Sequence, residues 1–473
     1  MKNCIVSGLY TDFYELTMAQ AYFDSSLRDS HATFDLYFRS NPFNGGYAVF
    51  AGLEEAVDTL TRIRFSGEDL DFLEKQGFQR DFLDFLETFR FSGDVTGFRE
   101  GDIVFGGEPL LRVAGSIIET QIVETLLLNI INFQTLVATK AMRTVHAARG
   151  RTVIDFGMRR AQGLAAMSAS RAAYIGGVTG TSNTAAASLY GIPSVGTHAH
   201  SWVQGFESEL EAFRTFARTY PENTTLLVDT YDTLASGIPN AIRVGLELRQ
   251  QGKQLGGIRL DSGDLAYFSR KARQALDEAG LEDVKIVASN QLDESLILSL
   301  LDQGAPIDVF GVGTRLVTAH DQPALDGVYK MSVMDDRPTL KFSENPEKIN
   351  LPGAKQVIRY LNGDDRFALD AIALADEEPG RIRVVRHPSV EFKQTRVDRE
   401  DLHPQSVFHP IMRSGQLLEP FPSLDQVRAF AFERFKLLPD GHKRFVHPHV
   451  YRIGLSNRMY RMRRELIKRR RVR

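Results

Sequence analysis

The sequence has little cysteine, little net charge and no long uninterrupted apolar run, and each shortage excludes a class of protein. One cysteine among 473 residues, Cys4, excludes internal disulfides and fits a reducing compartment, so we expect a cytoplasmic protein. A formal net charge of -3 argues against general nucleic-acid binding, which needs a basic surface. The most apolar segment, 124–142, is interrupted by polar residues and Lys140, which favours a buried helix over a membrane span.

The length predicts two or three domains, because one hydrophobic core rarely grows to this size. Residues 1–118 mix strand and helix patterns, which is typical of a separate α+β domain. Residues 119–335 are predicted to form an α/β barrel that carries the functional site. Residues 336–473 are predicted to pack on the N-terminal domain as a C-terminal extension and to end in a basic tail.

The predicted barrel rests on six β-branched runs that alternate with helical patterns. Such a series requires a parallel sheet, closed or nearly closed, and the uneven spacing favours an irregular barrel. Gly252, Gly280 and Gly304 each follow a helical pattern, where a C-terminal cap is expected. The six runs are 152–155, 192–197, 224–229, 257–261, 285–289 and 307–314.

Polar or glycine-rich motifs follow nearly all of these runs. In parallel βα folds, ligands bind at the carboxyl ends of the strands, so these motifs predict one polar cavity for an anionic ligand that carries phosphate. The motifs are "DFGMRR" (155–160), "GTHAHS" (196–201), "VDTYD" (228–232), "RLDSGD" (259–264), "ASNQ" (288–291) and "GVGT" (311–314).

Taken singly, the motifs leave alternatives open. The backbone of "GVGT", helped by Thr314 and Arg315, could bind an anion or simply form a tight turn. In "RLDSGD", Arg259 could neutralise phosphate while Asp261 and Asp264 hold ribose hydroxyls or magnesium. The other interpretation is a structural ion pair with Asp264 as a helix N-cap.

The two histidines of "GTHAHS", His198 and His200, pose the question of a metal, a structural or a catalytic role. Zinc needs further ligands at a known spacing, and no cysteine cluster or second histidine pair lies nearby. A histidine among arginines and carboxylates can act as a base or accept phosphate. The Walker signature is absent, so a nucleotide must be held in another way. The basic C-terminus from Arg458 is most simply a solvated or frayed helix end, and an anion site is the minority interpretation.

Seven motifs, in this order, resemble nicotinate phosphoribosyltransferases of the type II phosphoribosyltransferase family. They are "GLYTDFYELTMAQAYF", "DFGMRRAQG", "GTSN", "GTHAHS", "RLDSGD", "GVGTRL" and "KFSENPEKINLPG". The resemblance implies an irregular barrel plus an open-faced α+β sandwich. It also implies that nicotinate and 5-phosphoribosyl 1-diphosphate give nicotinate mononucleotide and diphosphate for NAD synthesis. Magnesium, ATP hydrolysis coupled through a phosphohistidine, and a homodimer with shared active sites are further implications.

The resemblance also assigns residues. His200 matches the phosphorylated histidine, with Asp229 holding its other ring nitrogen, while Tyr14 and Phe156 match the aromatic pair that stacks on the pyridine ring. Asn183 stands where related nicotinamide enzymes have an aspartate, which fits a carboxylate substrate. The remaining substrate-binding positions are Arg159 for a carboxylate or phosphate, Arg259, Asp261 and Ser262 for diphosphate and ribose, and Gly311, Gly313 and Thr314 for the 5-phosphate.

Three alternatives remain at this point. One is a non-catalytic scaffold, which explains neither the arginines nor the convergent carboxylates, whose burial would be costly without ligands. The same chemistry could use nicotinamide or another pyridine. A barrel aldolase or isomerase for sugar phosphates would share the phosphate site, but it typically needs a lysine or a metal pair at a strand end, and none of the six motifs contains lysine.

Overall fold

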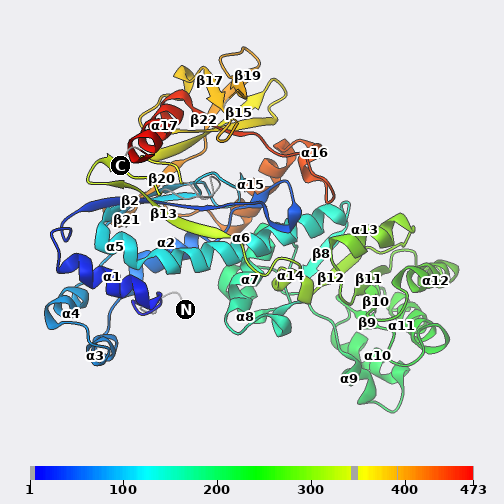
Figure 1. Ribbon diagram of the computed structural model, residues 1–473. Coiled ribbons are helices and arrows are strands. Elements are labelled where there is room, and N and C mark those ends of the chain that lie inside the picture. The colour runs from blue at the N-terminus through cyan, green and yellow to red at the C-terminus, as the bar shows by residue number, and fades with distance from the viewer. Residues whose placement is uncertain (1–5, 342–349, 391, 472–473) are drawn as a thin grey trace. The chain divides into compact units, whose positions relative to one another are not determined.

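The computed structural model describes residues 6–341, 350–390 and 392–471, so much of the motif "KFSENPEKINLPG" lies outside the described residues (Figure 1). The chain divides into two compact units. The barrel unit is Val137–Pro323, and the two-segment unit combines Met1–Leu136 with Ala324–Arg473. The limits predicted from the sequence are residues 118 and 335. No helix within the described ranges has the length and apolar character needed to cross a membrane.

The barrel unit contains a five-stranded parallel sheet, which confirms the mixed α/β fold class (Figure 1). Its strand order is β8-β12-β11-β10-β9. The first and last of these strands along the chain, β8 and β12, are therefore neighbours, as in a nearly closed barrel. Each strand is short and mostly buried. The strands are β8 (Thr152–Asp155), β9 (Thr225–Leu227), β10 (Gly257–Leu260), β11 (Lys285–Ser289) and β12 (Val309–Val312).

Helices connect these strands, and glycines end three of them as predicted. Gly252, Gly280 and Gly304 have φ values of 73°, 70° and 72°, in the left-handed region that glycine adopts without steric cost. The helices of this unit are α7 (Ala165–Ile175), α8 (Thr184–Tyr190), α9 (His200–Gln204), α10 (Glu209–Thr219), α11 (Ile238–Gln250), α12 (Leu265–Glu278), α13 (Glu294–Asp302) and α14 (Thr314–Val317).

The predicted strand at 192–197 is wrong. That segment makes only an isolated bridge between Ser194 and Thr181, and Thr181 in turn bridges Asp155 at the end of β8. Pro193 has no N–H to donate, which limits ladder formation here. Strands β8 and β9 are the two ends of the sheet order and are not paired with each other. Near β9, the His198 ring accepts a hydrogen bond from the backbone N–H of Leu227, at 3.1 Å. We call these single contacts, between β8 and β9, the barrel seam.

The two-segment unit contains a seven-stranded antiparallel sheet built from both stretches of chain. Its order is β14-β13-β2-β7-β5-β20-β21, so β13 and β20 from the second stretch pair with β2 and β5 from the first. The first stretch supplies β2 (His31–Phe38), β5 (Asp94–Gly97) and β7 (Leu111–Ser116). The second supplies β13 (Gly327–Met334), β14 (Arg337–Pro338), β20 (His409–Arg413) and β21 (Gln416–Leu417).

A second sheet comes from the second stretch alone, in the order β18-β17-β22-β16-β15-β19. The basic C-terminus is an ordered helix, α17 (Asn457–Arg471), rather than a frayed tail. Its Met459 and Tyr460 are buried in a cluster with Leu455, Ile372 and Leu374. The strands are β15 (Lys355–Asn362), β16 (Phe367–Leu374), β17 (Val384–Arg386), β18 (Gln394–Arg396), β19 (Leu402–Ser406) and β22 (Ile453–Ser456).

Helices and short strands complete the two-segment unit. The apolar segment 124–142, predicted to be a buried helix, lies within α6, and α6 runs on into the barrel unit. The elements are β1 (Val6–Ser7), α1 (Phe13–Phe23), β3 (Ala48–Val49), α2 (Leu53–Arg62), β4 (Ile63–Arg64), α3 (Gly67–Lys75), α4 (Arg80–Glu87), β6 (Ile103–Val104), α5 (Ile117–Ile122), α6 (Glu124–Ala147), α15 (Leu424–Leu437) and α16 (Asp440–Lys443).

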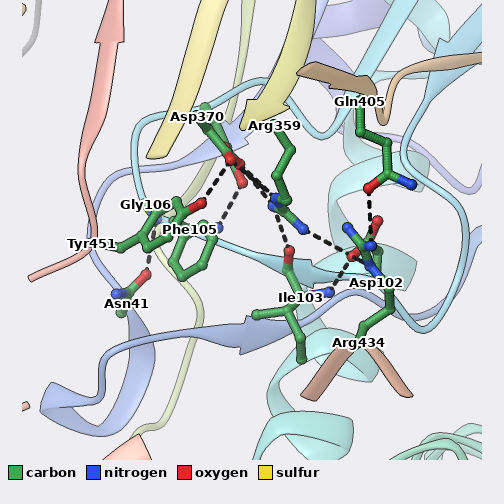
Figure 2. A network of polar contacts seen from close by, with 11 residues as sticks. Asn41, Asp102, Ile103, Phe105, Gly106, Arg359, Asp370, Gln405, Arg434 and Tyr451 are labelled. Atoms are coloured by element: carbon green, nitrogen blue, oxygen red, sulfur yellow. Dashed lines mark hydrogen bonds and ion pairs between the residues drawn. The ribbon is translucent and has the colours of Figure 1, made fainter. Parts of the chain in front are cut away.

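A buried polar network joins the two stretches of this unit (Figure 2). The Arg359 guanidinium donates to Asp102 at 3.0 Å and to Asp370 at 2.7 Å, and all three side chains are almost fully buried. Arg434 donates to Asp102 at 2.8 Å, and the Tyr451 hydroxyl donates to Asp370 at 2.9 Å. Two guanidiniums thus balance two carboxylates, as buried charges require.

Candidate active site

The carboxyl ends of the barrel strands bring most of the predicted site residues of this unit into neighbouring positions. The clearest contact is between Phe156, which follows β8, and Gly311 in β12. A Cβ atom at Gly311 would lie 2.5 Å from the Phe156 ring, so only glycine lets the ring rest against that strand. The ring also packs against Ile154, Val287 and Val309. Phe156 is therefore a half-buried aromatic surface held at the sheet edge.

Arg259, near the end of β10, is a cation close to this ring. Its guanidinium carbon lies 5.9 Å from the Phe156 ring centroid, and its Nη1 donates to the Thr197 hydroxyl at 2.5 Å. Its Nε is buried without a hydrogen-bond partner among the described residues. Burial lowers the pKa of Arg259, while Asp261 and Asp229 oppose that effect. A partly desolvated guanidinium with a spare donor is suited to bind an anion.

Two carboxylates at the ends of β9 and β10 are linked through the backbone. Asp229 Oδ2 accepts from the Asp261 N–H at 2.8 Å and from the Ser262 hydroxyl at 2.6 Å. Asp261 Oδ1 accepts from the Ser289 hydroxyl at 2.6 Å. Asp229 Oδ1 is buried and has no hydrogen-bond partner in the described part of the chain. The pair thus retains acceptor capacity that no described residue uses.

His200 opens α9 and has a 40% exposed side chain. Its Nδ1 lies 3.1 Å from the Thr230 hydroxyl, and its Nε2 lies 3.8 Å from Asp261 Oδ2. The expectation that Asp229 holds the second ring nitrogen therefore needs correction. The Asp229 Oδ2 atom is bonded to Asp261 and Ser262 instead, and the neighbouring Thr230 takes the place next to the imidazole.

His198 has a structural position in the barrel seam. It is only 7% exposed, and besides its contact with Leu227 its Nδ1 lies 3.3 Å from the Ala199 carbonyl. With Nδ1–H as donor and Nε2 as acceptor, both contacts are satisfied by the neutral ring. Burial lowers the pKa of His198 to about 4. His198 is thus neutral at physiological pH.

Asn183 differs from the expectation that it contacts the substrate. It is fully buried at the N-cap of α8, where its side-chain oxygen accepts from the Ala186 N–H at 3.2 Å. Its amide nitrogen donates to the Ala166 carbonyl at 3.1 Å. Since both ends of the amide are engaged with the backbone, Asn183 fixes α8 against α7 rather than facing a ligand.

The remaining predicted residues lie as follows. Arg159 is exposed in the turn after Phe156, and its charge is close enough to lower the pKa of Arg259. Asp264 caps α12 by accepting from the Tyr267 N–H at 2.9 Å, which supports the N-cap interpretation. Gly313 and the exposed Thr314 mark the turn from β12 into the short helix α14. Tyr14, on α1, is 47% exposed and belongs to the two-segment unit, so its pairing with Phe156 stays a prediction.

Three hydroxyls that support the site were assigned no role from the sequence. Thr197 holds Arg259, Thr230 contacts His200 and Ser289 holds Asp261. Each lies within one of the polar motifs or strand ends, so motif position alone could have suggested them. No group of three or more metal-ligating side chains occurs among the residues that the structure describes.

Three family models together match most of the chain. Residues 9–132 match the nicotinate phosphoribosyltransferase N-terminal domain, 152–348 match the nicotinate phosphoribosyltransferase family, and 354–463 match the corresponding C-terminal domain.

Individual proteins give the same result. The nicotinate phosphoribosyltransferase of Bacillus subtilis is 44% identical over 95% of this chain and 93% of its own length. That of Dictyostelium discoideum is 37% identical over 97% of this chain and 88% of its own length. The crystal structure of human nicotinic acid phosphoribosyltransferase superposes with a TM-score of 0.85 at 30% identity, covering 96% of this chain and 99% of the human chain.

Proposed function

Because the chain belongs to the nicotinate phosphoribosyltransferase family, we propose that it forms nicotinate mononucleotide and diphosphate from nicotinate and 5-phosphoribosyl 1-diphosphate. The reaction would contribute to NAD synthesis by salvage. The observation that carries this proposal is the cluster at the strand ends, where Phe156 lies against Gly311 and beside Arg259 and the linked carboxylates. An aromatic surface next to a cation and unused acceptors suits a flat anionic base and a phosphorylated sugar.

In this proposal the roles follow from the contacts. Phe156 stacks on the pyridine ring, and Arg159 pairs with the nicotinate carboxylate or a phosphate. Arg259 binds the diphosphate that departs from the ribose, since its Nε is a buried donor without a described partner. Asp261 accepts hydrogen bonds from ribose hydroxyls. The Ser289 hydroxyl fixes the orientation of this carboxylate by donating to its Oδ1 at 2.6 Å. The site thus lowers the barrier mainly by positioning the substrates and stabilising charge on the leaving group.

We extend the proposal to ATP through His200. With hydrogen on Nδ1 donated to Thr230, the Nε2 lone pair can attack the γ-phosphorus. The N–P bond forms as the bond from phosphorus to the ADP oxygen breaks, and ADP leaves. A phosphoryl group on His200 would add negative charge at the strand ends and change the local binding of ribosyl diphosphate.

Magnesium is the proposed cofactor, and the carboxylate pair fits it. Mg²⁺ is commonly bound by one or two carboxylates together with substrate phosphates. Asp229 has a buried oxygen with no partner among the described residues, and the nearby Asp261 could supply a second ligand. When bound, the ion would neutralise part of the diphosphate charge.

The test of the ATP step uses radiolabelled ATP and three proteins: the unchanged chain, His200→Ala and His320→Ala. His320 is the matched control, an exposed histidine of the same unit. His200→Ala should lose ATP hydrolysis and the acid-labile phosphoprotein, yet retain slow mononucleotide synthesis at high ribosyl diphosphate. His320→Ala should keep both activities. A label that survives in His200→Ala would disprove the assignment of the phosphorylated residue.

Substrate choice and assembly are tested separately. Incubation with nicotinate or nicotinamide should give mononucleotide far faster from nicotinate, and equal rates would favour the nicotinamide alternative. A homodimer with shared sites predicts that Tyr14→Ala chains and His200→Ala chains, each lacking ATP-coupled mononucleotide synthesis, regain part of that coupled activity when their subunits exchange. No recovery after confirmed exchange would argue for sites built within one chain.

A further inference from the structure

The basic C-terminal helix contributes to a pocket that the proposed reaction does not use. The pocket lies in the two-segment unit, has a volume of about 310 Å³, and is formed between α17 and the C-terminal end of β17. Small-molecule sites usually have volumes of roughly 300–1,000 Å³, so this pocket is at the small end of the range. Its lining is Arg386, Tyr460, Arg461, Arg464, Glu465 and Lys468.

The charge of this pocket is opposite in sign to that of the whole chain. Four cationic side chains face one carboxylate, Glu465, whereas the chain carries a formal net charge of -3. Arg461 and Lys468 are both exposed, whereas Arg458 at the start of the same helix pairs with Asp376 at 2.9 Å. Arg464 and Lys468 are four residues apart on α17, a spacing at which like charges repel. An anion in the pocket would relieve that repulsion.

Buried neighbours hold the cations in place. The guanidinium carbons of Arg386 and Arg464 lie 5.3 and 5.8 Å from the centroid of the buried Tyr460 ring, within the range of cation–π attraction. Arg386 also donates to Asn457 at 2.8 Å. The neighbouring Arg463, outside the pocket lining, donates to the Pro388 carbonyl at 2.5 Å and so ties α17 to the segment after β17, and burial lowers the pKa of its guanidinium. The cations are thus partly organised before any ligand binds.

The spacing of the cations indicates the ligand. Arg461, Arg464 and Lys468 follow the i, i+3, i+7 pattern, so they lie on one face of α17. Seven helical residues span about 10 Å, so linked phosphates can contact both end residues with their side chains extended, whereas a single phosphate would require both side chains to bend towards it. We propose that this pocket binds a small anion with two or three linked phosphates, such as the polyphosphate group of a nucleotide or inorganic triphosphate.

The test is calorimetric titration of the full chain with inorganic triphosphate. We compare Arg461→Gln/Lys468→Gln with Arg458→Gln/Arg469→Gln, which removes the same charge from the same helix outside the pocket. Glutamine retains helix propensity, so both variants should fold and keep the basal rate of mononucleotide synthesis. The first variant should bind triphosphate at least tenfold more weakly than the unchanged chain, and the second should bind nearly normally.

Arg259→Gln separates this pocket from the barrel site, because triphosphate could also bind there. Binding that Arg259→Gln retains and Arg461→Gln/Lys468→Gln loses belongs to the pocket. Equal weakening in both charge variants would mean nonspecific attraction and would overturn the proposal. The proposal would also be overturned if an RNA oligonucleotide bound through Arg461 and Lys468 while triphosphate did not bind. This result does not depend on the proposed reaction, since the unit and the residues are different.

Discussion

The barrel seam makes the stability of the protein sensitive to acid through one buried side chain. His198 accepts a hydrogen bond from Leu227 only while its Nε2 is unprotonated. A proton on Nε2 would place two donors against each other in a buried position. Its pKa is lowered from 6.5 to about 4 in the folded state. A group with a lowered pKa contributes stability above its unfolded value, and that stability is lost as pH falls from 6.5 towards 4.

The magnitude follows from the two pKa values. Between pH 7.5 and pH 5, the folded protein should lose about 2 kcal/mol through this histidine, and about 3 kcal/mol once the pH is below 4. His198→Gln replaces the imidazole with an amide whose oxygen can still accept from Leu227. This variant should therefore lack that part of the pH dependence. Its stability at pH 7.5 should change less than that of His198→Ala, which leaves the Leu227 N–H unsatisfied.

The chain provides its own reporter for this experiment. Trp202 is its only tryptophan, and both its ring and that of His198 pack against Phe216, with centroid distances of 5.9 and 4.9 Å. Denaturant unfolding followed by tryptophan fluorescence at pH 7.5 and pH 5 therefore reads the free energy of unfolding of this region. His320→Gln, at an exposed position, should keep the pH dependence of the unchanged chain. Equal losses in the unchanged chain and His198→Gln would refute the reasoning.

Three further predictions concern other buried positions. Asn183→Asp loses the donor to Ala166 and puts a carboxylate near that carbonyl, so melting should show a cost of about 1–3 kcal/mol, with the preference between nicotinate and nicotinamide unchanged. Gly311→Ala should displace Phe156 and lower kcat/KM for nicotinate at least tenfold, whereas Gly196→Ala, whose added Cβ meets no atom within 4 Å, should not. Burial raises the pKa of the Glu108 carboxyl well above its usual value, so the protonated side chain stabilises the fold at low pH and this stability is lost as pH rises through the folded pKa. The melting temperature of Glu108→Gln should therefore fall less than that of the unchanged chain on going to alkaline pH.

The parts of the fold that sequence patterns predicted correctly depend on neighbours in the chain. The helix ends at Gly252, Gly280 and Gly304 follow from local backbone conformation, and the parallel strands follow from short apolar runs. The segment 192–197 has an apolar pattern like that of the true strands, but whether it pairs as a strand depends on contacts with residues distant in the sequence, such as Thr181. Propensity cannot supply that tertiary information.

The site shows the same limit. The sequence identified which strand ends are polar, because parallel strands place those ends along one edge. It could not decide between Asp229 and Thr230 as the neighbour of His200, since the two differ by one position and the backbone direction selects between them. Nor could it show that the Asn183 amide is engaged by backbone groups on both sides. Hydrogen-bond partners distant in sequence require the structure.

The division of one unit between the two ends of the chain has a consequence for synthesis on the ribosome. Strand β2 emerges early, but its partner β13 follows about 290 residues later, and β5 waits even longer for β20. The barrel unit, by contrast, is one continuous stretch that can fold once Pro323 has left the exit tunnel. Strands β2 and β5 can both pair early with β7, but the outer edge of each must stay unpaired through most of translation. A stalled chain that ends before Arg359 also leaves Asp102 without its buried guanidinium, so incomplete products should be targets for chaperones and proteases.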